Sequence, residues 1–452
     1  MPSPHVAVVG GGLAGLSASV ALADSGLRVS LLERSPRLGG RATSYELPGG
    51  ETIDNCQHVT LRCCTNLADF YRRVGVADKI HYYDCLHFGG PNGRRAQIKS
   101  SGLPAPLHLA PGFAAFAFLN WKDKRVIART LLRIVRNGGR PKLPATMTMF
   151  DWLKKKQNQT ARAIDRFWTP VLVSALNEDL RRMDAAYGVA VFWKAFLSNP
   201  QGFAIGIPSV PLAELYTFSH ERIEVRTRAG VAEILLKDDS CTAVRLDDGS
   251  QVSADYIIVA IPFDRLLKVL PERLRGEPQF ANLSNLRVSP ITSVHFWFDR
   301  AVMDEPFIAA LDQTIQWVFN KANGHYVQIV ISASHQLTQK SQQEIIELCR
   351  KELADLIPAS GGAGLTRSVV IRENSATFSP QPGCDVFRPA QRTPVRNLFI
   401  AGDWTQTGWP ATMESAVRSG YLAAEEILSR EGHEARLLQP ELAVSGLAKW
   451  LS

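Results

Sequence analysis

Apolar residues near the start of the chain fall into two short runs with a helical stretch between them. His5–Gly10 is rich in valine and ends in glycine, and this pattern predicts a buried strand. Leu13–Ser25 is rich in Ala, Leu and Ser and predicts a helix, with Gly26 suited to a left-handed C-cap. Arg28–Glu33 predicts a second buried strand. The three segments together predict a βαβ unit with parallel strands.

The rest of the chain alternates between helical and strand patterns. Residues 61–215 are expected to be mainly helical, with breaks at proline and glycine. Two later runs, Ile291–Phe298 and His325–Ser332, predict antiparallel strands of a separate sheet. Further strands are predicted within Ile223–Pro262 and at Ser368–Ser375 and Asn397–Ala401, and helices at Ser341–Ile357 and Met413–Leu428. We therefore expect an α/β protein with more than one sheet.

Composition narrows the class of protein. The chain has 452 residues, 45% of them hydrophobic, with 51 Lys and Arg against 43 Asp and Glu, and its net charge is +8. These values exclude a collagenous chain and a mostly disordered one. Because the charge is mild and no nucleic-acid-binding module is recognised, no nucleic acid is expected as a partner.

The cysteines and the apolar runs bear on the compartment. The seven cysteines are odd in number and include no Cys-x-x-Cys, which argues against a disulfide framework and against a zinc ribbon, and no metal is expected. A reducing, cytoplasmic setting fits this pattern best. Glycines at 10–12 interrupt the first apolar run, and no run of about 18 apolar residues occurs, so neither a signal peptide nor a transmembrane helix is expected.

A glycine-rich turn joins the first predicted strand to the first predicted helix. It reads Gly10-Gly11-Gly12-Leu13-Ala14-Gly15, a Gly-x-Gly-x-x-Gly pattern. Gly10 permits the tight turn, Gly12 lets a pyrophosphate approach the backbone, and Gly15 lets the helix pack on the strand. Glu33, at the end of the next strand, suits ribose hydroxyls and repels a 2′-phosphate. The unit predicts a dinucleotide site at the helix N-terminus, and the motif alone leaves FAD and NAD open.

The segments around this turn favour FAD. Arg34–Arg41 reads RSPRLGGR, a basic loop directly after Glu33, and a hydrophobic strand near the C-terminus ends at Asp403. With these features the chain resembles the FAD-dependent amine oxidase and phytoene desaturase superfamily. The resemblance implies FAD contacts from Arg34, Gly39, Gly40 and Arg41 at the phosphates, from Val231 at the adenine, and from Gly402, Asp403, Thr412 and Met413 at the ribityl chain and the flavin. The backbone N–H of Met413 is the expected donor to the flavin N1–C2=O edge.

The same resemblance implies an architecture. It predicts an α/β fold with a Rossmann-like FAD-binding domain of the amine oxidase type and an interleaved α+β substrate-binding domain. The FAD-binding domain is expected from residues 1–100, 216–265 and 386–452. The substrate-binding domain is expected from a helical insertion at 101–215 and a mixed sheet at 266–385. We expect the active site where the two meet, over the flavin.

A narrower resemblance rests on the loop Asp54-Asn55-Cys56-Gln57-His58-Val59 and the following Cys63-Cys64-Thr65-Asn66-Leu67. Together with the stretch Gly402–Gly420, these motifs resemble the squalene-associated FAD-dependent desaturases, the hydroxysqualene dehydroxylases. Cys56 departs from that family, which usually has glycine at this position. A cysteine would be strained there if the backbone needs a positive φ.

This second resemblance implies a reductive reaction on an isoprenoid alcohol. Hydroxysqualene would lose its hydroxyl and become squalene, in squalene or hopanoid synthesis. We hypothesise protonation of the hydroxyl, loss of water, and hydride transfer from reduced flavin N5 to the allylic cation. His58 is the first candidate for the acid because it titrates near neutrality, Gln57 would orient the hydroxyl or water, and Asp54 would hold the flavin or protonate the substrate. Hydrogen bonding within the loop is the alternative role for all three.

Other functions stay open on the same scaffold. A carotenoid desaturase of the phytoene type runs the hydride transfer in reverse, and a flavin amine oxidase usually has an aromatic cage, to which Trp404 and Trp409 could contribute. Core packing is the alternative role for both tryptophans. A non-catalytic prenyl-binding escort protein is the third candidate, and the retained glycines, Glu33 and Arg41 speak against it.

Residues 108–142 bear on membranes. His108–Trp121 is apolar and aromatic, and Lys122–Lys142 holds eight Lys or Arg and one Asp. A basic amphipathic helix is indicated by the spacing of Arg125, Arg129, Arg133 and Arg136. We expect a cytoplasmic bacterial protein in peripheral contact with anionic lipid through this region, with upstream enzymes of the squalene pathway as further candidate partners. A buried helix with a solvated arginine face is the alternative.

Overall fold

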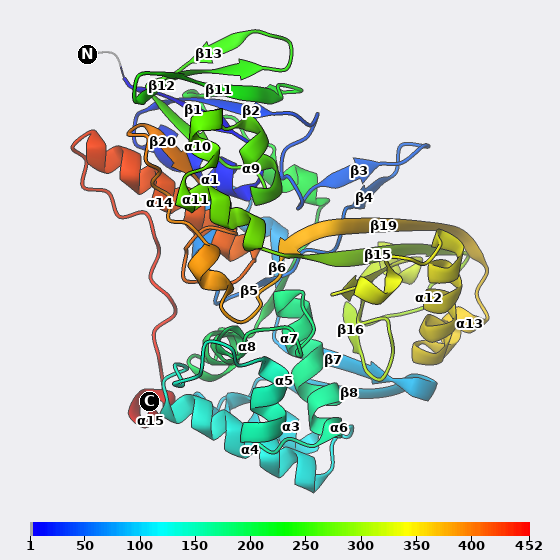
Figure 1. Cartoon of the computed structure of the whole chain (residues 1–452). Helices are drawn as coiled ribbons and strands as arrows, with labels where there is room; N and C mark the ends of the chain where they lie inside the picture. The colour runs from blue at the N-terminus through cyan, green and yellow to red at the C-terminus, as the bar shows by residue number, and fades with distance from the viewer. Residues whose placement is uncertain (1–2) are drawn as a thin grey trace.

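The computed structural model of the chain describes residues 3–452 (Figure 1). Its N-terminal unit consists of β1 (His5–Val9), α1 (Leu13–Asp24) and β2 (Arg28–Glu33), as predicted. Three later strands join it: β10 (Ile223–Thr227), β14 (Tyr256–Val259) and β20 (Leu398–Ile400). All five pair in parallel, in the order β10-β2-β1-β14-β20. The predicted α/β fold class is confirmed.

This parallel sheet is buried on both faces. Val6 and Val8 of β1 share a core with α1 and with α14 (Met413–Arg430). Ala7 and Val9 share a second core with a three-stranded antiparallel sheet. That sheet consists of β11 (Val231–Lys237), β12 (Ser240–Leu246) and β13 (Gln251–Ser253), and it forms the top of the molecule in Figure 1. Because side chains alternate between the faces of a strand, burial of both faces makes β1 continuously apolar.

The helices α1 and α14 both begin at the carboxyl edge of the parallel sheet, after β1 and β20 respectively. They lie close together because Gly420 has no side chain: a Cβ there would come within 2.2 Å of Ser17 Oγ and 2.3 Å of Ala14 O. Ser17 Oγ also donates to the carbonyl of Val417 at 3.3 Å. This packing brings two helix N-termini to one edge of the sheet, where their free N–H groups favour an anion.

A second, seven-stranded sheet forms the right-hand part of Figure 1, with strand order β19-β15-β18-β17-β16-β7-β8. Its strands are β7 (Cys85–Gly90), β8 (Arg94–Lys99), β15 (Val288–Phe298), β16 (Phe307–Ala310), β17 (Trp317–Lys321), β18 (Tyr326–Ser332) and β19 (Leu365–Phe378). The predicted antiparallel pair is present as β15 and β18, with Val294 opposite Ile329. The helix α12 (Gln342–Leu356) packs its apolar stripe on this sheet.

The prediction that residues 61–215 are mainly helical is wrong for part of that stretch. Residues 80–99 form β6 (Ile80–Tyr83), β7 and β8, and a further strand, β9 (Ile205–Pro208), pairs with β6 and with β5 (Thr60–Leu61). The strand β7 pairs in parallel with β16, about 220 residues later in the chain, through Phe88 and Ala309. The strand also pairs with the adjacent β8 as an antiparallel hairpin, so only its pairing with β16 depends on a distant segment and leaves no local pattern.

The remaining part of that stretch is helical and forms the lower layer of Figure 1. Its helices are α3 (Ala110–Ala115), α4 (Trp121–Arg136), α5 (Met149–Asp151), α6 (Ala161–Ala163), α7 (Thr169–Leu176) and α8 (Ala185–Val191). The helix α2 (Thr65–Arg73) lies apart from this layer and packs with α14 in the core of the parallel sheet. The helix α4 starts at a capping box, in which Asn120 and Asp123 each accept from the other's backbone N–H. The helices α5, α6 and α8 each continue into one π-helical turn, the last at Phe192–Leu197.

Short elements complete the chain. They are β3 (Ser44–Glu46), β4 (Thr52–Asp54), α9 (Phe263–Val269), α10 (Glu272–Arg275), α11 (Pro278–Ala281), α13 (Pro358–Gly361) and α15 (Ala448–Leu451). Among residues 3–452, no helix combines the length and the apolar character that crossing a bilayer requires.

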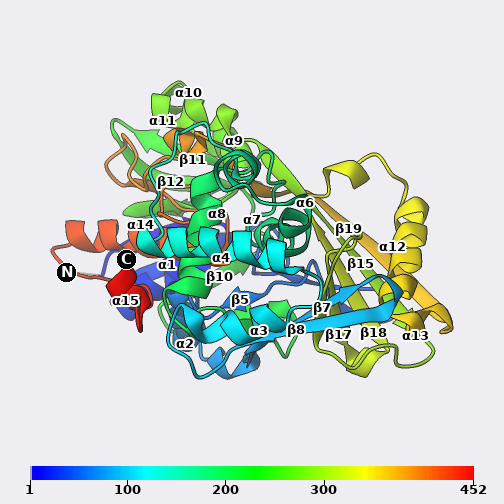
Figure 2. The same ribbon diagram turned by 90° about the horizontal axis from the view of Figure 1, so that it is seen from below.

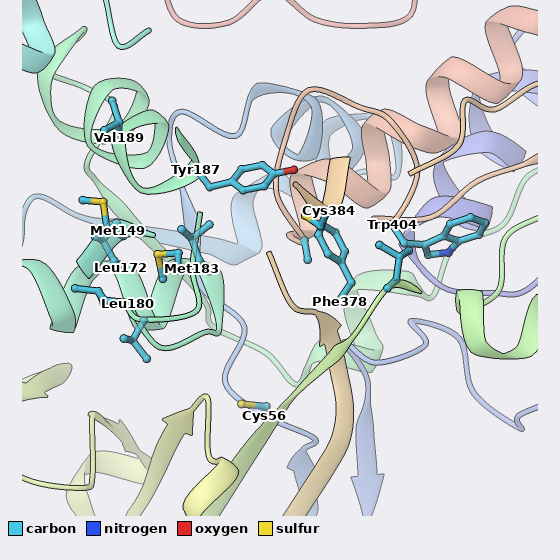
Figure 3. Packing of buried hydrophobic residues seen from close by; sticks show 14 of the residues in the cluster. Cys56, Met149, Leu172, Leu180, Met183, Tyr187, Val189, Phe378, Cys384 and Trp404 are labelled. Carbon is cyan, nitrogen blue, oxygen red and sulfur yellow. The ribbon is translucent and has the colours of Figure 1, made fainter. Parts of the chain in front are cut away.

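A continuous core joins the helical layer to the parallel sheet. Figure 3 shows Tyr187 of α8 reaching from the helices toward Phe378, Cys384 and Trp404, which come from β19 and from the segments on either side of β20. Cys56 belongs to the same core and lies on a separate loop below them. The chain therefore packs its N-terminal loop, its helical layer and its C-terminal segment around one shared interior.

Candidate active site

The glycine-rich turn after β1 has the geometry that a phosphate group needs. Gly10 has a φ of +108°, and a Cβ there would lie 2.5 Å from Ala260 O. A Cβ on Gly15 would lie 1.9 Å from Gly10 O, so only glycine allows the close packing of α1 on the strand. A Cβ on Gly12 would meet nothing nearer than Gly40 Cα at 3.9 Å. The backbone of Gly12 is therefore open toward the cavity that it borders.

The predicted phosphate-side loop folds back onto this turn. Gly39 N donates to Gly11 O at 2.8 Å, and Gly39 forms a bridge with Gly12. Gly39 and Gly40 have φ values of +97° and +61°, which glycine adopts without strain. Both glycines and Arg34 border the same cavity as Gly12. The two glycine segments thus present adjacent stretches of backbone to one ligand.

Arg41 joins this loop to the C-terminal strand. Its Nη2 donates to Asp403 Oδ1 at 2.7 Å, and its Nη1 donates to Ala376 O. Burial lowers the pKa of Arg41, but the Asp403 carboxylate outweighs it and the pKa lies above its ordinary value. Arg41, Asp403 and the preceding Gly402 all border the cavity. The salt bridge fixes the guanidinium at the wall of the cavity, where the predicted phosphate contact of Arg41 stays a prediction.

Glu33 ends β2 on the opposite side of the glycine turn. It is buried, and its two carboxylate oxygens accept from Gly11 N at 2.6 Å and from Ser35 N at 2.7 Å. These bonds fix the carboxylate at the cavity wall, and its remaining lone pairs face that space. Val231, predicted to lie at the adenine, borders the same end of the cavity.

The N-terminus of α14 closes the site from the other side. Thr412 Oγ1 caps the helix by accepting from Ser415 N at 3.2 Å, and Thr412 and Met413 border the cavity. The positive end of the helix dipole therefore points at whatever binds there, which favours an anionic reduced flavin edge.

Glu414, the next residue, has a structural role that the sequence did not indicate. It is fully buried, and its carboxylate accepts from the backbone N–H groups of Asn66 at 3.2 Å and Leu67 at 2.8 Å. Burial raises the pKa of Glu414, and the hydrogen bonds from α2 oppose that rise. The side chain caps α2 and ties it to the start of α14.

The cavity itself has a volume of about 1310 Å³. Pockets for one small molecule commonly enclose ~300–1,000 Å³, so this cavity has room for a dinucleotide and a second ligand. The end away from the glycine turns is largely apolar. Its walls come from β7, α7, β15, β17 and the π-helical turn Phe192–Leu197, called the π-turn below. Examples are Leu86, Val171, Phe196, Phe203, Ile291 and Phe319.

Asp54 does not border this cavity, although the sequence makes it a catalytic candidate. Its Oδ1 accepts from Ser44 Oγ at 2.8 Å and from Leu212 N at 2.9 Å, and its Oδ2 lies 3.4 Å from Lys321 Nζ. The carboxylate is therefore hydrogen-bonded to Ser44 and Leu212 and paired with Lys321 of β17. These contacts favour the alternative role for Asp54, hydrogen bonding within the protein.

Cys56 borders the cavity without backbone strain. It is absent from the residues with positive φ in the described chain, so glycine is not required at this position. Burial raises the pKa of its thiol to about 12, which keeps the sulfur protonated and unreactive at neutral pH.

Gln57 and His58 both border the cavity. Gln57 is 8% exposed, and neither its Nε2 nor its Oε1 has a hydrogen-bond partner among the described residues. His58 Nδ1 lies 2.9 Å from Cys56 O, which assigns the ring proton to Nδ1 and leaves a lone pair on Nε2. Burial lowers the pKa of His58 below its usual 6.5, so the ring is neutral at pH 7. The loop presents one unpaired amide and one neutral imidazole to the cavity.

Three residues that line or support the cavity were not singled out by the sequence analysis. Tyr187 borders the cavity, donates to Asp385, and accepts from Arg388 Nη1 at 2.6 Å. Arg388 is buried, and its Nη2 donates to the carbonyls of three residues in the loop before α14: Asp403 at 3.2 Å, Thr405 at 2.6 Å and Trp409 at 2.8 Å. Because these acceptors are backbone atoms, no sequence motif marks the arginine that holds them.

Lys194 is the third of these residues and lies on the π-turn after α8. Its ammonium stands 4.9 Å from the centre of the Trp409 ring and pairs with Glu441. The indole of Trp409 also donates to Glu441, at 3.2 Å. Lys194, Trp409 and Trp404 all border the cavity, so both tryptophans form part of its wall, as one reading of the sequence expects.

These features together fit FAD. The open backbone at Gly12 and Gly40 suits its pyrophosphate, Glu33 suits its ribose, and the capped start of α14 suits its flavin edge. The cavity is continuous from these residues to the apolar end. The residues predicted for the phosphates, the ribose and the flavin edge therefore all border one cavity.

Comparison with known proteins supports this assignment. The chain is 27% identical to the 15-cis-phytoene desaturase of Solanum lycopersicum, over 94% of this chain and 77% of that protein. It is 25% identical to the 15-cis-phytoene desaturase of Synechococcus elongatus, over 94% of this chain and 96% of the other.

Solved structures share the fold. An oxidoreductase from Methanosarcina mazei matches with a TM-score of 0.70 at 16% identity, covering 94% of this chain and all of that one. The cyclohexylamine oxidase of Brevibacterium oxydans matches with a TM-score of 0.66 at 16% identity, covering 96% of this chain and all of that one. The family model for the sequences of flavin containing amine oxidoreductases matches residues 13–428, nearly the whole chain. The protein therefore belongs to the flavin containing amine oxidoreductase family, and its cofactor is FAD.

Proposed function

We propose that this oxidoreductase removes the hydroxyl group of hydroxysqualene and releases squalene. The unpaired amide of Gln57 carries the proposal, because it is a buried polar group beside a largely apolar space. A buried polar group without a partner costs about 1–3 kcal/mol, so this side chain suits a ligand with one hydrogen-bonding group. Hydroxysqualene brings one hydroxyl on an otherwise apolar chain. The resemblance of the loop Asp54–Val59 to hydroxysqualene dehydroxylases supports the same substrate.

The overall reaction breaks one C–O bond and forms one C–H bond. The hydroxyl takes up a proton and leaves as water, and reduced FAD, when bound, would supply the hydride for the carbon and be left oxidised. Gln57 Nε2 donates to the substrate oxygen and thereby orients it toward His58. The proton passes from His58 Nε2, because Nδ1 is held by the Cys56 carbonyl.

The lowered pKa of His58 favours transfer of the proton from the ring to the substrate hydroxyl. Once protonated, the buried imidazole is a stronger acid than an ordinary histidine, because burial disfavours its charge. Apolar walls around the leaving group exclude water, which would otherwise capture the cation and restore the alcohol. Loss of the proton returns His58 to its neutral state.

A second candidate is a carotenoid desaturase. The relatives at 25–27% identity are named phytoene and zeta-carotene desaturases, and the apolar end of the cavity suits a polyene as well. This reaction starts from oxidised FAD and a hydrocarbon, and it leaves Gln57 without a partner from the substrate.

The decisive experiment is an anaerobic half-reaction. The purified protein is reduced with light or dithionite, hydroxysqualene in detergent is added, and the flavin absorbance band and the extracted lipids are followed. The proposal predicts that the oxidised band returns with one squalene formed per flavin. Flavin that stays reduced with hydroxysqualene, together with reduction of the oxidised protein by phytoene, would replace the proposal with the desaturase.

A further inference from the structure

Exposed hydrophobic side chains are concentrated in one part of the surface. Among residues 3–452, eleven large hydrophobic side chains are exposed, and seven of them lie within residues 103–132 and 447–451. The two most exposed are Trp450 at 86% and Trp121 at 78%. The other five are Leu103, Leu107, Leu132, Leu447 and Leu451. Single exposed hydrophobic residues are ordinary, but a concentration of this kind marks an interaction surface.

The two segments form one face of the molecule. The helix α15 attaches to the segment before α3 through a hydrogen bond from Ala448 N to Ala105 O at 3.0 Å, and it also contacts α4. Lys124 Nζ of α4 donates to Ala114 O of α3 at 2.6 Å. Figure 1 places α3, α4 and α15 along the bottom edge, and Figure 2, seen from below, shows all three in front. We call this surface the α3/α4/α15 face.

The same face is strongly basic. The helix α4 carries six Lys and Arg, none of which forms a salt bridge within the described chain, and α15 adds Lys449. Asp123 is the only acidic residue between 103 and 136, and it is 2% exposed because it caps α4 and accepts from Thr160. The exposed hydrophobic side chains of this face are therefore surrounded by Lys and Arg, with no exposed acidic residue between positions 103 and 136 to offset their charge.

We infer that the α3/α4/α15 face docks on an anionic lipid surface, with Trp121 and Trp450 inserted at the headgroup level. Tryptophan flanked by Lys and Arg suits the boundary between headgroups and acyl chains, and anionic lipid supplies the counter-charge. A second copy of this chain would bring the same positive charge to the contact and be repelled. The inference extends the lipid contact expected for residues 108–142 to the C-terminal helix.

The face also lies over the apolar end of the cavity. Phe113 of α3 packs edge-on against Phe167 at 5.4 Å between ring centres, and Phe167 stacks on Phe192 of the π-turn that carries the cavity residue Phe196. The helix α4 packs against the same π-turn. Docking of this face would set the apolar end of the cavity next to the acyl chains.

Sedimentation of the FAD-loaded protein with lipid vesicles tests the inference without any turnover, so its outcome is separate from that of the proposed reaction. Phosphatidylcholine vesicles with and without phosphatidylglycerol are the two probes. We expect binding to the anionic vesicles and little to the zwitterionic ones. The double variant Arg125→Gln/Arg129→Gln should bind about thirty-fold more weakly, from the usual gain of each cation near such a surface. Trp121→Ala/Trp450→Ala should bind about ten-fold more weakly.

Two variants on other faces serve as matched controls. Lys237→Gln removes an exposed cation from β11, and Val386→Ala removes a side chain that is 74% exposed. Both should bind as the unchanged protein does, and all variants should keep their flavin. Equal binding by the tryptophan variant, or no preference for anionic lipid, would overturn the inference. A dimer in solution that the tryptophan variant loses would assign the face to self-association instead.

Discussion

The two ends of the cavity are built in different ways. At the nucleotide end, the wall is formed mainly by glycine backbone. Gly12 and Gly40 leave open space, and the missing Cβ at Gly15 allows the helix to pack. At the apolar end, side chains from β7, α7, β15 and β17 meet although they are far apart in the sequence. One end depends on a local conformation and the other on the assembly of the whole chain. A substitution at the nucleotide end should therefore affect cofactor binding, and a substitution at the apolar end should affect substrate binding.

The loop at residues 55–58 lies between the two ends. Asn55 Nδ2 donates to Arg41 O at 2.9 Å, which ties the loop to the cofactor side. Further along the loop, Gln57 presents an unpaired amide to the cavity, and the imidazole of His58 borders the same space. The reaction that we propose takes place where these regions meet. The following substitutions test whether the ends are separable, beginning with the largest expected effect.

Gly15→Ala should abolish FAD binding. A Cβ at this position would lie 1.9 Å from Gly10 O, and backbone cannot yield as a flexible side chain does. We expect a loss of about 3 kcal/mol in the free energy of unfolding and a purified protein without the flavin band. Gly276→Ala is the matched control, because a Cβ there meets nothing within 4 Å. A yellow, stable Gly15→Ala protein would contradict this account of the nucleotide end.

His58→Gln should lower kcat about a hundred-fold, the usual contribution of a positioned general acid. Burial lowers the pKa of His58 below 6.5, so its protonated fraction grows only as the pH falls through that lowered pKa. For the unchanged protein we expect kcat to rise toward acid pH, and for the variant a flat profile. A kcat that rises with pH in the unchanged protein would show that His58 acts as a base.

Ala175→Phe should raise KM for the substrate about twenty-fold while leaving FAD binding intact. Ala175 of α7 borders the cavity, and the added ring would occupy space that we assign to the isoprenoid chain. Bound flavin per protein and steady-state kinetics measure the two effects separately. Loss of flavin together with substrate binding would mean that the two ends are not independent.

Arg41→Gln should weaken FAD binding about ten-fold, the order expected for one hydrogen bond to a charged group. The guanidinium donates to Asp403 and to a backbone carbonyl, so its removal also leaves a carboxylate without its partner. Titration of the flavin-free protein with FAD gives the dissociation constant. Lys237→Gln offers a control, because it removes an exposed cation that does not border the cavity, and an equal effect there would point to general charge instead.

The sequence was most informative where structure is local. The β1–α1–β2 unit, Glu33 and the start of α14 follow from short motifs, because each depends on residues within a few positions of one another. The strands β7 and β8 were expected as part of a helical stretch, although they pair with each other as a hairpin; only the further pairing of β7 with β16 depends on a distant segment. Asp54 is a catalytic candidate from its motif, and its contacts with Leu212 and Lys321, which lie far away in the sequence, are visible only in the structure.

Tyr187 and Arg388 illustrate the remaining limit of local patterns. Neither belongs to a motif, and the bond between them joins the helical layer to the segment before β20. Arg388 gains its importance from three carbonyls in the loop of residues 403–409, which any sequence would supply. Such residues become visible only when the distant segments have packed.

The most direct test of the central claim compares ligands at Gln57. FAD-loaded protein is titrated with hydroxysqualene and with squalene, and perturbation of the flavin absorbance reports binding. The account predicts that the unchanged protein prefers the alcohol, and that Gln57→Leu binds both ligands alike because it replaces the unpaired amide with an apolar side chain of similar size. Equal binding of the two ligands by the unchanged protein would contradict the claim that this site selects a hydroxylated isoprenoid.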